Sequence, residues 1–517
     1  MHKLIQTAFK KPLVLFAVIV GVYLITHLPA LTALPVFADE TIYIRWSQLL
    51  ISDPKQYFFF ALNDGKTPLF IWMLVPFELF FSDPVYAARF LSVLAGLAQI
   101  FFSWMLVTTL GGKKRAQLFT VLAITFLPYW YFHHRIGLMD AWLTVWGTAA
   151  ATFFIKSITK KKHSFLYAAT AAVFSACAFI TKVPAVLLLP AFFPFLFIEN
   201  IKSWKRSLSN FKNISVFGAV LIALLTPLLF VAGFPQLFSR GSDFLFSLSE
   251  FLSGSWLQSA SSLPNYAWYF LSYCSSGFFL LCIYGLFISF KNKRPFILSL
   301  LSGLIFLAPI FLLGKVVYPR YLLPALPFFT VAAALVFEEL LLRIDTLTTV
   351  VKRLSLASLL FLIVVTQFSV VSFEFMTRSL LAPDTIPFVA ADRTQYLTEW
   401  SSGHGILETV RYIESQAQTK RVAVATEGYF GTLPDGILLY LFHKDVHNIW
   451  IEGIGQPVRG IPSSFAVKAQ EFDQILLVVN SHRLLTTFPN GRLVSSYCRP
   501  YQAPCLQVWD ITGEIKN

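Results

Sequence analysis

Long apolar runs separated by short polar connections dominate the first three quarters of the chain. A run of about 17 to 25 apolar residues is long enough to cross a bilayer as a helix, and this pattern predicts about eleven transmembrane helices. The expected spans are residues 12–34, 86–110, 116–132, 138–156, 164–181, 184–199, 213–232, 267–290, 296–314, 321–341 and 355–375. An odd number of spans places the two ends of the helical region on opposite sides of the membrane.

Basic side chains gather at every second connection between these runs. The clusters are Lys3/Lys10/Lys11, Lys113/Lys114/Arg115, Lys160/Lys161/Lys162, Lys202/Lys205/Arg206, Lys291/Lys293/Arg294 and Lys352/Arg353. By the positive-inside rule they lie in the cytoplasm, so the N-terminus is inside and residues after about 376 are outside. A cleavable signal peptide at 12–34 is the weaker alternative, because this run is long for such a peptide.

Two of the connections on the predicted outer side are long, residues 35–85 and 233–266. Within the first, the apolar stretches 41–51 and 68–81 suit helices that lie in the membrane interface. Loops of this length in a compact protein are usually functional.

From about residue 377 the chain becomes more polar and richer in Gly and Pro. Strand-like runs alternate with helix-like runs, which predicts a small extracytoplasmic α/β domain. The expected strands are Arg421–Thr426, Asn448–Glu452, Gln474–Val479 and Leu506–Ile511, and the expected helices are His404–Gln416 and Pro434–His443. The sequence therefore divides into a transmembrane domain, residues 1–376, and an outer domain, residues 377–517.

Composition supports a polytopic membrane protein. Hydrophobic residues make up 56% of the 517 residues and charged residues only 13%, whereas a soluble domain needs about a quarter charged residues. This excludes a soluble enzyme, a disordered chain and a coiled coil. The net charge of +14 is spread over the short clusters and forms no stripe, so we expect no nucleic-acid partner.

The chain has five cysteines, too few for a disulfide scaffold or a Cys-based zinc module. Cys177, Cys274 and Cys282 lie in apolar runs and indicate packing residues. Cys498 and Cys505 lie in the polar C-terminal part, where they either form one disulfide in an oxidising compartment or remain unpaired.

Candidate chemistry begins with Asp39 and Glu40, directly after the first span. Desolvation beside an apolar helix moves a carboxyl toward the range useful for a general base. The alternative for Asp39 is a helix N-cap, with the helix starting near Thr41. The two interpretations are compatible.

Lys66 stands on a Gly turn in Asp64-Gly65-Lys66-Thr67. A phosphate loop would need Gly at position 60, where this chain has Phe60, so a nucleotide-binding loop is excluded. A lysine here suits a lipid phosphate, and a snorkelling side chain is the alternative.

Three further candidates lie at predicted outer helix ends: Asp140, Lys182 and Arg320. Asp140 sits in the first turn of a span, where the helix dipole alone explains a carboxylate. Lys182 and Arg320 lie on the predicted outer side, against the positive-inside bias, so their positive charges need another explanation.

Arg135 precedes Asp140 by five residues, so the two side chains do not share one face of a helix. The adjacent His133 and His134 are a weak metal candidate, because neighbouring side chains usually point apart.

These residues together resemble membrane glycosyltransferases of the GT-C superfamily, in the branch of the dolichyl-phosphate-mannose protein mannosyltransferases and the lipid A aminoarabinose transferases. The resemblance covers residues 1–340 and rests on the order and common sidedness of the motifs. They are Asp39-Glu40 with Tyr43, the Asp-Gly-Lys-Thr-Pro-Leu stretch at Lys66, Arg135 to Asp140, Thr181-Lys182, and Pro319-Arg320-Tyr321-Leu322-Leu323-Pro324.

The resemblance implies an inverting enzyme that takes a sugar from a polyprenyl-phosphate donor in the outer leaflet, with Asp39 as the base. Substrate binding falls to Glu40, Tyr43, Lys66, Arg135, Asp140, Lys182, Arg320 and Tyr321. The expected partners are this donor, membrane lipids and an extracytoplasmic protein, lipid or glycan acceptor, in the cell membrane. No cofactor is required and no metal ligand is assigned, although a divalent metal stays open.

A transporter or flippase for lipid-linked substrates is the rival from another class. It would need polar groups near the membrane midplane, whereas most spans here carry their charges at one face. A structural scaffold would not need Asp39, Lys66, Asp140, Lys182 and Arg320 on one side. Within enzymes the rivals are an oligosaccharide transferase, a polysaccharide ligase and a lipid phosphatase.

Overall fold

The computed structural model of the protein describes residues 12–198, 204–346, 350, 354, 358, 371–444 and 446–516. Several sequence-based expectations fall outside these residues. They are the basic residues Lys3, Lys10, Lys11, Lys202, Lys352 and Arg353 and most of the span 355–375.

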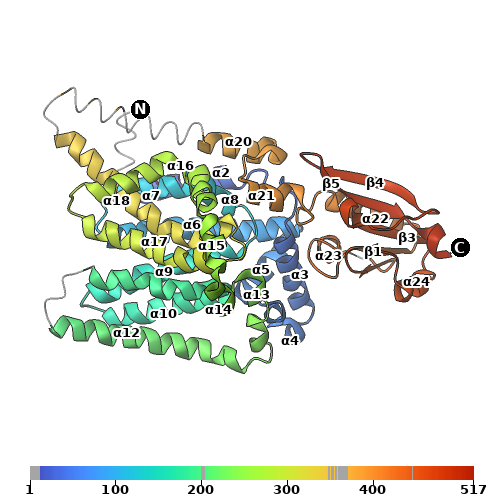
Figure 1. The fold of residues 1–517 in the computed structure, drawn as a ribbon, viewed down its shortest axis with the longest axis horizontal. Helices are drawn as coiled ribbons and strands as arrows, with labels where there is room; N and C mark the ends of the chain where they lie inside the picture. The colour runs from blue at the N-terminus through green and yellow to red at the C-terminus, as the bar shows by residue number, and fades with distance from the viewer. Residues whose placement is uncertain are drawn as a thin grey trace. The chain divides into compact units, whose positions relative to one another are not determined.

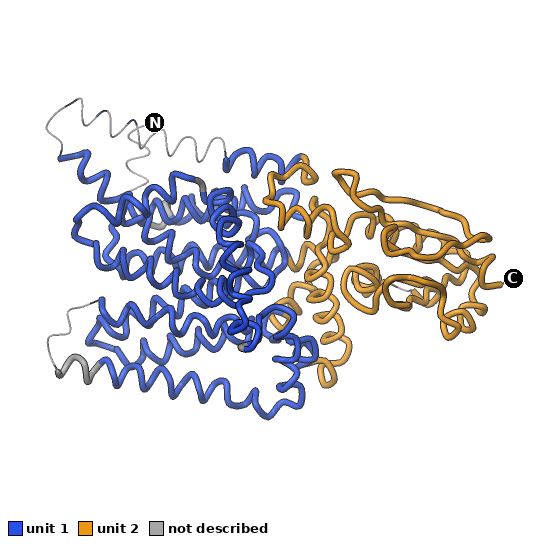
Figure 2. The backbone as a smooth tube through the Cα atoms, in the orientation of Figure 1, with its two compact units in different colours: residues 1–31, 59–70, 89–381 blue, residues 32–58, 71–88, 382–517 orange. Residues whose placement is uncertain are grey.

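The described chain forms two compact units (Figure 2). Unit 1 contains residues 1–31, 59–70 and 89–381, and unit 2 contains residues 32–58, 71–88 and 382–517. The first long outer connection is therefore shared between the units. Its middle belongs with the helices of unit 1, and its two ends belong with the C-terminal part of the chain.

Unit 1 is built from helices whose side chains are mostly apolar. They include α2 (Pro12–His27), most of α6 (Pro84–Thr109), α7 (Lys114–Phe126), α8 (Pro128–His133), α9 (Met139–Thr159), α10 (Ser164–Thr181), α12 (Trp204–Leu225), α16 (Leu263–Phe287), α17 (Lys293–Leu313), the 3₁₀ turn η7 (Pro319–Ala325) and α18 (Leu326–Thr346). Helix α10 packs against both α9 and α12 (Figure 1). Helices suit an apolar solvent because every backbone hydrogen bond stays within the segment.

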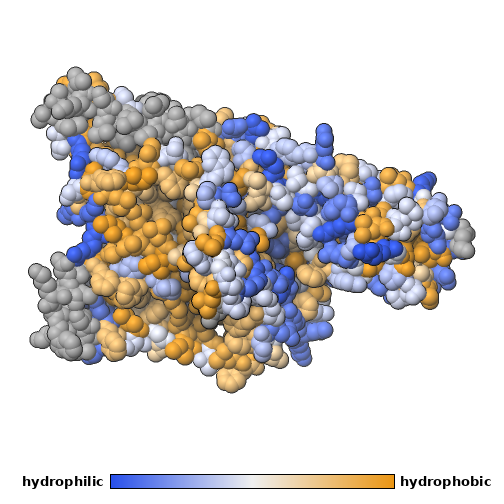
Figure 3. All heavy atoms as spheres, in the orientation of Figure 1, coloured by the Kyte–Doolittle hydropathy of each residue, from blue (hydrophilic) through white to orange (hydrophobic). Residues whose placement is uncertain are grey.

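Within the described residues, five helices are long and apolar enough to cross a membrane, or six if a bent pair counts as one span. The five are Pro84–Thr109, Ser164–Thr181, Asn210–Phe230, Lys293–Leu313 and Pro319–Thr346. Apolar side chains cover much of the visible surface of unit 1 (Figure 3). These features mark an integral membrane protein, in agreement with the sequence.

The count of eleven spans is not confirmed, and proline explains part of the difference. Pro128 stands at the start of α8 and separates it from α7, which ends at Phe126. The expected span 184–199 divides into η2 (Val183–Leu187), α11 (Leu188–Phe192) and η3 (Phe193–Phe197), with a proline in each piece. A proline removes one backbone donor and clashes with the preceding turn, so an apolar run need not be one regular helix.

The second long outer connection is helical in short pieces. They are η5 (Phe234–Phe238), α13 (Gly241–Phe244), α14 (Leu248–Glu250), the π-helical turn η6 (Phe251–Ser255) and α15 (Trp256–Ser261). In the first long connection, both expected helices are present as α3 (Ala38–Ser52) and α5 (Leu69–Phe80), with η1 (Phe60–Asp64) between them.

Unit 2 contains a five-stranded sheet in the order β2-β1-β3-β5-β4. The strands are β1 (Val422–Thr426), β2 (Ile449–Gly453), β3 (Gln474–Asn480), β4 (Arg492–Arg499) and β5 (Ala503–Asp510). Strand β1 pairs in parallel with β2 and β3, whereas β5 is antiparallel to β3 and β4. The α/β domain and its four expected strands are thus present. Strand β4 was not expected, because this edge strand carries mostly exposed or half-buried side chains and has no apolar alternation.

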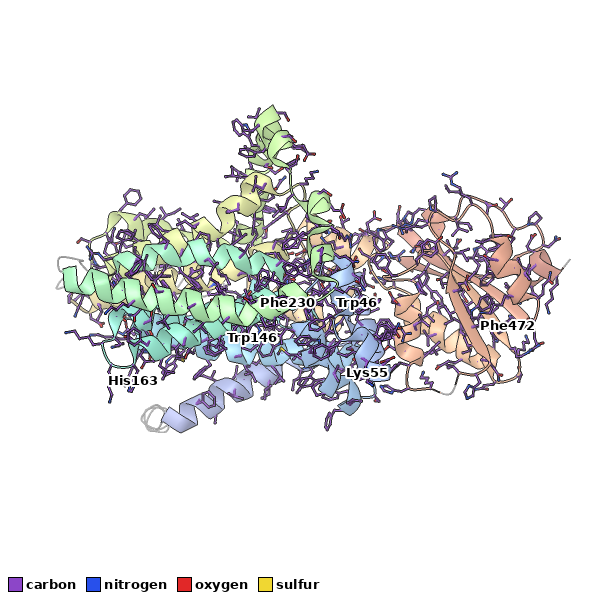
Figure 4. The ribbon with its side chains drawn as sticks, turned by 90° about the horizontal axis from the view of Figure 1, so that it is seen from below. Trp46, Lys55, Trp146, His163, Phe230 and Phe472 are labelled. Carbon is purple, nitrogen blue, oxygen red and sulfur yellow. A yellow bond between two sulfur atoms is a disulfide. The ribbon has the colours of Figure 1, made fainter. Side chains whose placement is uncertain are left out.

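The helices of unit 2 include α22 (Ile406–Ala417), α23 (Asp435–Leu441) and α24 (Ser463–Ala469). The first two match the expected helices, and α24 was not expected. Trp450 of β2 stacks on Phe465 of α24 at 4.7 Å between ring centroids, and on Phe472, which Figure 4 labels, at 5.5 Å. These rings form part of the buried core on one side of the sheet.

Cys498 and Cys505 are joined by a disulfide, and they face each other directly across the β4–β5 hairpin. Of the two alternatives left open by the sequence, the structure has the bridged one. Cys177, Cys274 and Cys282 are free thiols in unit 1.

Candidate active site

Helix α3 of unit 2 carries the predicted acidic pair in its first turn. The helix begins at Ala38 with Phe37 as its N-cap, so the expected start near Thr41 and the interpretation of Asp39 as the N-cap are wrong. The side chain of Glu40 accepts a hydrogen bond of 2.9 Å from the Phe37 N–H and is fully buried. This bond satisfies one of the donors that a helix start leaves unpaired, whereas Asp39 is half-buried.

Tyr43 lies one turn further along α3 and is buried. Its ring centroid is 6.4 Å from that of Trp46, which Figure 4 labels on the same helix. The structure therefore brings Asp39, Glu40 and Tyr43 together on one short helix, as their spacing in the sequence requires.

Asp140 and Lys182 form an ion pair in unit 1, with 2.7 Å between Lys182 Nζ and Asp140 Oδ1. Asp140 stands in the first turn of α9, and Lys182 directly follows α10 as its C-cap. The Asp140 side chain is 4% exposed and that of Lys182 is 21% exposed, so solvent screens this pair only in part. The Asp140 carboxyl thus lies beside both the N-terminal end of the α9 dipole and the Lys182 ammonium group.

The turn η7 brings Arg320 and Tyr321 to this ion pair. Lys182 Nζ lies 5.1 Å from the centre of the Tyr321 ring, and the Arg320 guanidinium lies 5.4 Å from the same ring. A second contact places the Arg320 guanidinium 5.3 Å from the Tyr318 ring. Four predicted residues, Asp140, Lys182, Arg320 and Tyr321, thus form one group, which we call the cation–tyrosine cluster.

Helix α8 supports η7 from the side. The Tyr129 hydroxyl donates a hydrogen bond of 2.5 Å to the Pro319 carbonyl, just before Arg320. The Tyr129 ring also lies 5.6 Å from the ring of His133, which is buried. His133 thus packs among aromatic side chains, and the described residues contain no group of three or more His, Cys, Asp or Glu side chains that could hold a metal ion.

Lys66 belongs to a second charged group in unit 1. Lys66 Nζ and Arg240 Nη1 each lie 2.7 Å from a different oxygen of Asp64, and Arg240 Nε lies 3.1 Å from Asp243 Oδ2. Gly65 adopts φ +69°, which glycine permits, so the expected Gly turn is present. Arg240 comes from the second long outer connection, so an ion pair joins the two connections.

Arg135 has another set of partners. Its guanidinium donates to the carbonyls of His27, Pro29 and Ala30, at 2.8 Å from Nη2 to Pro29 O and 3.1 Å to Ala30 O. These carbonyls lie at and just beyond the last residue of α2, where backbone acceptors lack helical partners. Arg135 therefore fixes the end of α2.

Three partners were missed from the sequence: Asp64, Arg240 and Tyr318. Asp64 carried a local signal, because it stands two residues before Lys66 on the same turn. Arg240 carried none, since its partner is 176 residues away in the chain.

Residues 65–231 match the family model described as dolichyl-phosphate-mannose-protein mannosyltransferase. The fold is similar to that of ArnT from Cupriavidus metallidurans, with 16% identity, a TM-score of 0.59 and coverage of 98% of each chain. ArnT bound to undecaprenyl phosphate matches with 15% identity and a TM-score of 0.55, over 98% of this chain and 99% of ArnT.

An oligosaccharyltransferase from Archaeoglobus fulgidus, tethered to an acceptor peptide, matches at 12% identity with a TM-score of 0.50. This match covers 90% of the present chain and 68% of the other. No curated protein matches. The family model matches part of the chain, and the fold is similar to that of ArnT; both findings agree with the resemblance to GT-C glycosyltransferases.

Proposed function

We propose that the protein transfers a sugar from a polyprenyl-phosphate donor to an acceptor hydroxyl, with inversion at the anomeric carbon. The match to a dolichyl-phosphate-mannose family supports this donor class, as does the similarity to ArnT, which binds undecaprenyl phosphate. The matches give no support to the flippase alternative.

One observation carries the assignment of Asp39 as the base. Among the predicted carboxylates, Glu40 is fully buried and bonded to the start of its own helix, and Asp140 is 4% exposed and paired with Lys182. Asp39 is half-buried and stands in the same helical turn as Glu40. An acceptor hydroxyl needs access to its base, so Asp39 fits this role better than the other two.

The reaction then balances as a single displacement. The acceptor oxygen forms a bond with the anomeric carbon and passes its proton to the Asp39 carboxylate, while the bond from this carbon to the phosphate oxygen breaks. The electron pair leaves with the polyprenyl phosphate. Lys182, Arg320 and Lys66 stabilise the growing negative charge on that phosphate. The attraction between opposite charges is stronger in an apolar environment, where the dielectric constant is low.

Two of the remaining predicted residues contact the cations of unit 1. Asp140 pairs with Lys182, and the Tyr321 ring lies beside both Lys182 and Arg320. Contacts of Glu40, Tyr43 and Arg135 with substrate stay predictions. Inversion needs only one carboxylate near the acceptor, so these roles are not required by the reaction.

We also propose the finer topology: about eleven spans, a cytoplasmic N-terminus, and an extracytoplasmic domain from about residue 377 that faces the acceptor. The basic clusters that alternate with the apolar runs support this orientation. The acceptor is then a protein, lipid or glycan of the cell envelope.

The test uses the full chain in lipid nanodiscs with a radiolabelled polyprenyl-phosphate hexose and a panel of peptide, lipid and glycan acceptors. We expect donor-dependent transfer of label to one acceptor class. In sealed vesicles, movement of the intact donor across the bilayer without transfer of its sugar would contradict the proposal and favour the flippase.

A further inference from the structure

A buried polar chain in unit 2 connects the C-terminal sheet to the helix that carries Asp39. It begins at Arg499, the last residue of β4, which is 3% exposed. Arg499 donates from Nη1 to the Pro504 carbonyl at 2.6 Å, and from Nη2 to Asn480 Oδ1 at 2.6 Å and the Ser402 carbonyl at 3.0 Å. One guanidinium thus joins three segments of the unit.

The other side of this chain is anchored at the ends of two neighbouring parallel strands. Glu427 directly follows β1 and accepts a hydrogen bond of 2.8 Å from the backbone N–H of Asn480, at the end of β3. The side chain of Asn480 also donates to Glu427. Burial lowers the pKa of Arg499 to about 10, while the charges of Glu427 and Glu399 oppose this shift, so the guanidinium stays protonated near neutral pH.

The backbone around Ser402, whose carbonyl Arg499 holds, is hydrogen-bonded to the start of α3. Ser402 pairs with Phe37 in an antiparallel bridge. The Ala38 N–H donates to the Ser401 carbonyl and the Gly403 N–H donates to the Val36 carbonyl, each at 2.9 Å. These two hydrogen bonds form the bridge and hold the residues directly before Asp39.

Gly403 makes this approach sterically feasible. A Cβ at position 403 would stand 2.4 Å from the Val36 carbonyl oxygen, which is closer than real Cβ contacts allow. An alanine here would push the two backbones apart without removing any contact of Arg499.

A second attachment fixes the middle of α3. Gln48 Nε2 donates to the Leu439 carbonyl of α23 at 2.9 Å and to Glu78 Oε2 of α5 at 3.2 Å. Both attachments hold helix α3 within unit 2, and the first lies next to Asp39.

We propose that Arg499 is a positioning residue for the reaction: by fixing the Ser402 carbonyl, it sets the start of α3 and hence the orientation of the Asp39 carboxylate. This proposal rests on the proposed function. It gives the C-terminal domain a part in the chemical step that is separate from binding an acceptor. A general base must lie within hydrogen-bond reach of the proton it takes, and a displacement of about 1 Å costs up to about 100-fold in rate.

The test compares three variants of the full chain in nanodiscs. Arg499→Lys keeps the positive charge but replaces the planar guanidinium, which donates to the Pro504 and Ser402 carbonyls and to Asn480 Oδ1, by a single ammonium group. Gly403→Ala disturbs the same backbone pairing from the other side. Arg483→Met is the matched control, because Arg483 also contacts Glu427, at 3.5 Å, yet stacks on Trp400.

The first measurement is hydrogen–deuterium exchange of peptides that cover residues 36–44. We expect faster exchange in Arg499→Lys and Gly403→Ala, and wild-type exchange in Arg483→Met. Wild-type exchange in all three variants, each shown to be folded by its melting temperature, would overturn the proposal even if no acceptor has been found.

The second measurement is the rate of sugar transfer, with the polyprenyl-phosphate hexose as donor and the acceptor class found in the screen described under the proposed function. We expect kcat to fall about 10- to 100-fold in Arg499→Lys and Gly403→Ala, with undecaprenyl phosphate affinity unchanged. In an Asp39→Asn background, Arg499→Lys should cause no further loss, because it acts through Asp39. A full additional loss in that background would contradict the inference, whereas normal turnover of Asp39→Asn alone would contradict the proposed function.

Discussion

The two units hold their candidate charges in opposite ways. In unit 1, each predicted cation contacts a carboxylate or an aromatic ring, as Lys182 contacts Asp140 and Lys66 contacts Asp64. In unit 2, the acidic pair stands on a helix whose start is fixed by backbone hydrogen bonds. Side chains therefore hold the cations of the proposed phosphate site, and backbone hydrogen bonds hold the start of the helix that carries the proposed base.

This difference suits the two halves of the proposed reaction. A leaving phosphate is large and carries charge on several oxygens, so several cations at different helix ends can share it. Proton transfer instead depends on one carboxylate at one distance. The comparison predicts that cation variants change donor binding gradually, whereas a change at Asp39 stops the chemical step.

The largest expected effect is that of Asp39→Asn. The amide keeps the size of the side chain but cannot accept the acceptor proton, so we expect turnover to fall by at least about 100-fold. The measurement is single-turnover transfer of label from the polyprenyl-phosphate hexose.

Glu40→Gln is the matched control for this change. Its amide oxygen can still accept from the Phe37 N–H, so we expect most of the turnover to remain, with a melting temperature a few degrees lower. Near-normal turnover of Asp39→Asn, or an equal loss in both variants, would refute the distinction between the two carboxylates.

The next effect concerns the cations of unit 1. Lys66→Ala and Arg320→Ala each remove one charged donor, and a charged hydrogen bond is worth about 1.5–3 kcal/mol, so apparent donor affinity should fall about 10- to 100-fold. Arg343→Ala is the control, because Arg343 lies in the last turn of α18, the helix that η7 precedes, and it pairs with Glu339. If donor titrations give the same apparent donor affinity for all three variants, the proposal that Lys66 and Arg320 share one phosphate site is refuted.

A smaller effect tests the outer hairpin of unit 2. The disulfide closes a loop with a sequence separation of 7, which the chain-entropy model values at about 2.5 kcal/mol. We expect a lower melting temperature for the double variant Cys498→Ser/Cys505→Ser.

In intact cells, an impermeant thiol reagent should label these two cysteines only after mild reduction, in a background where Cys177, Cys274 and Cys282 are replaced by serine. A single cysteine at the exposed Asn490 checks the side of the membrane directly. If it is labelled only after the membrane is opened, the extracytoplasmic location is wrong.

The smallest effect is a pH dependence in unit 2. Burial raises the pKa of the Asp435 carboxyl to about 6, although the Gly431 N–H and the charge of Arg45 oppose the shift. The folded state therefore holds this proton more tightly than the unfolded state, and the contribution of Asp435 to stability falls as the pH rises from about 4 through about 6.

Asp435→Asn removes this titration. The difference in melting temperature, variant minus wild type, should grow between pH 4.5 and pH 7. A difference that stays constant over this range would show that Asp435 does not titrate as described.

Elements with a strong local signal could be predicted from the sequence. Strand β3, Gln474–Asn480, has five consecutive apolar residues between its polar ends, and all seven residues are buried, so its pattern and its environment agree. Helix α3 was also expected, but its first residue was misplaced. Two interactions fix the start of this helix: the hydrogen bond from the Phe37 N–H to Glu40, and the backbone pairing with residues 401–403. The second could not be predicted, because residues 401–403 are far away in the sequence.

The candidate site divides in the same way. The position of Lys182 against the positive-inside bias singled it out, and its partner Asp140 was also named, but nothing in the sequence paired them across 42 residues. Arg499 carried no signal at all, because it stands at the end of an edge strand among polar residues. Its importance depends on three acceptors that only the folded chain brings together.

The most direct test of the division between the units measures two quantities on the same variants. Binding of undecaprenyl phosphate and the rate of sugar transfer are determined for the wild type, Asp39→Asn and Arg320→Ala in nanodiscs. We predict that Asp39→Asn binds undecaprenyl phosphate as the wild type does but transfers sugar at least about 100-fold more slowly, and that Arg320→Ala binds at least about tenfold more weakly. If Asp39→Asn loses binding while Arg320→Ala keeps it, the assignment of the base to unit 2 and of the phosphate site to unit 1 is contradicted.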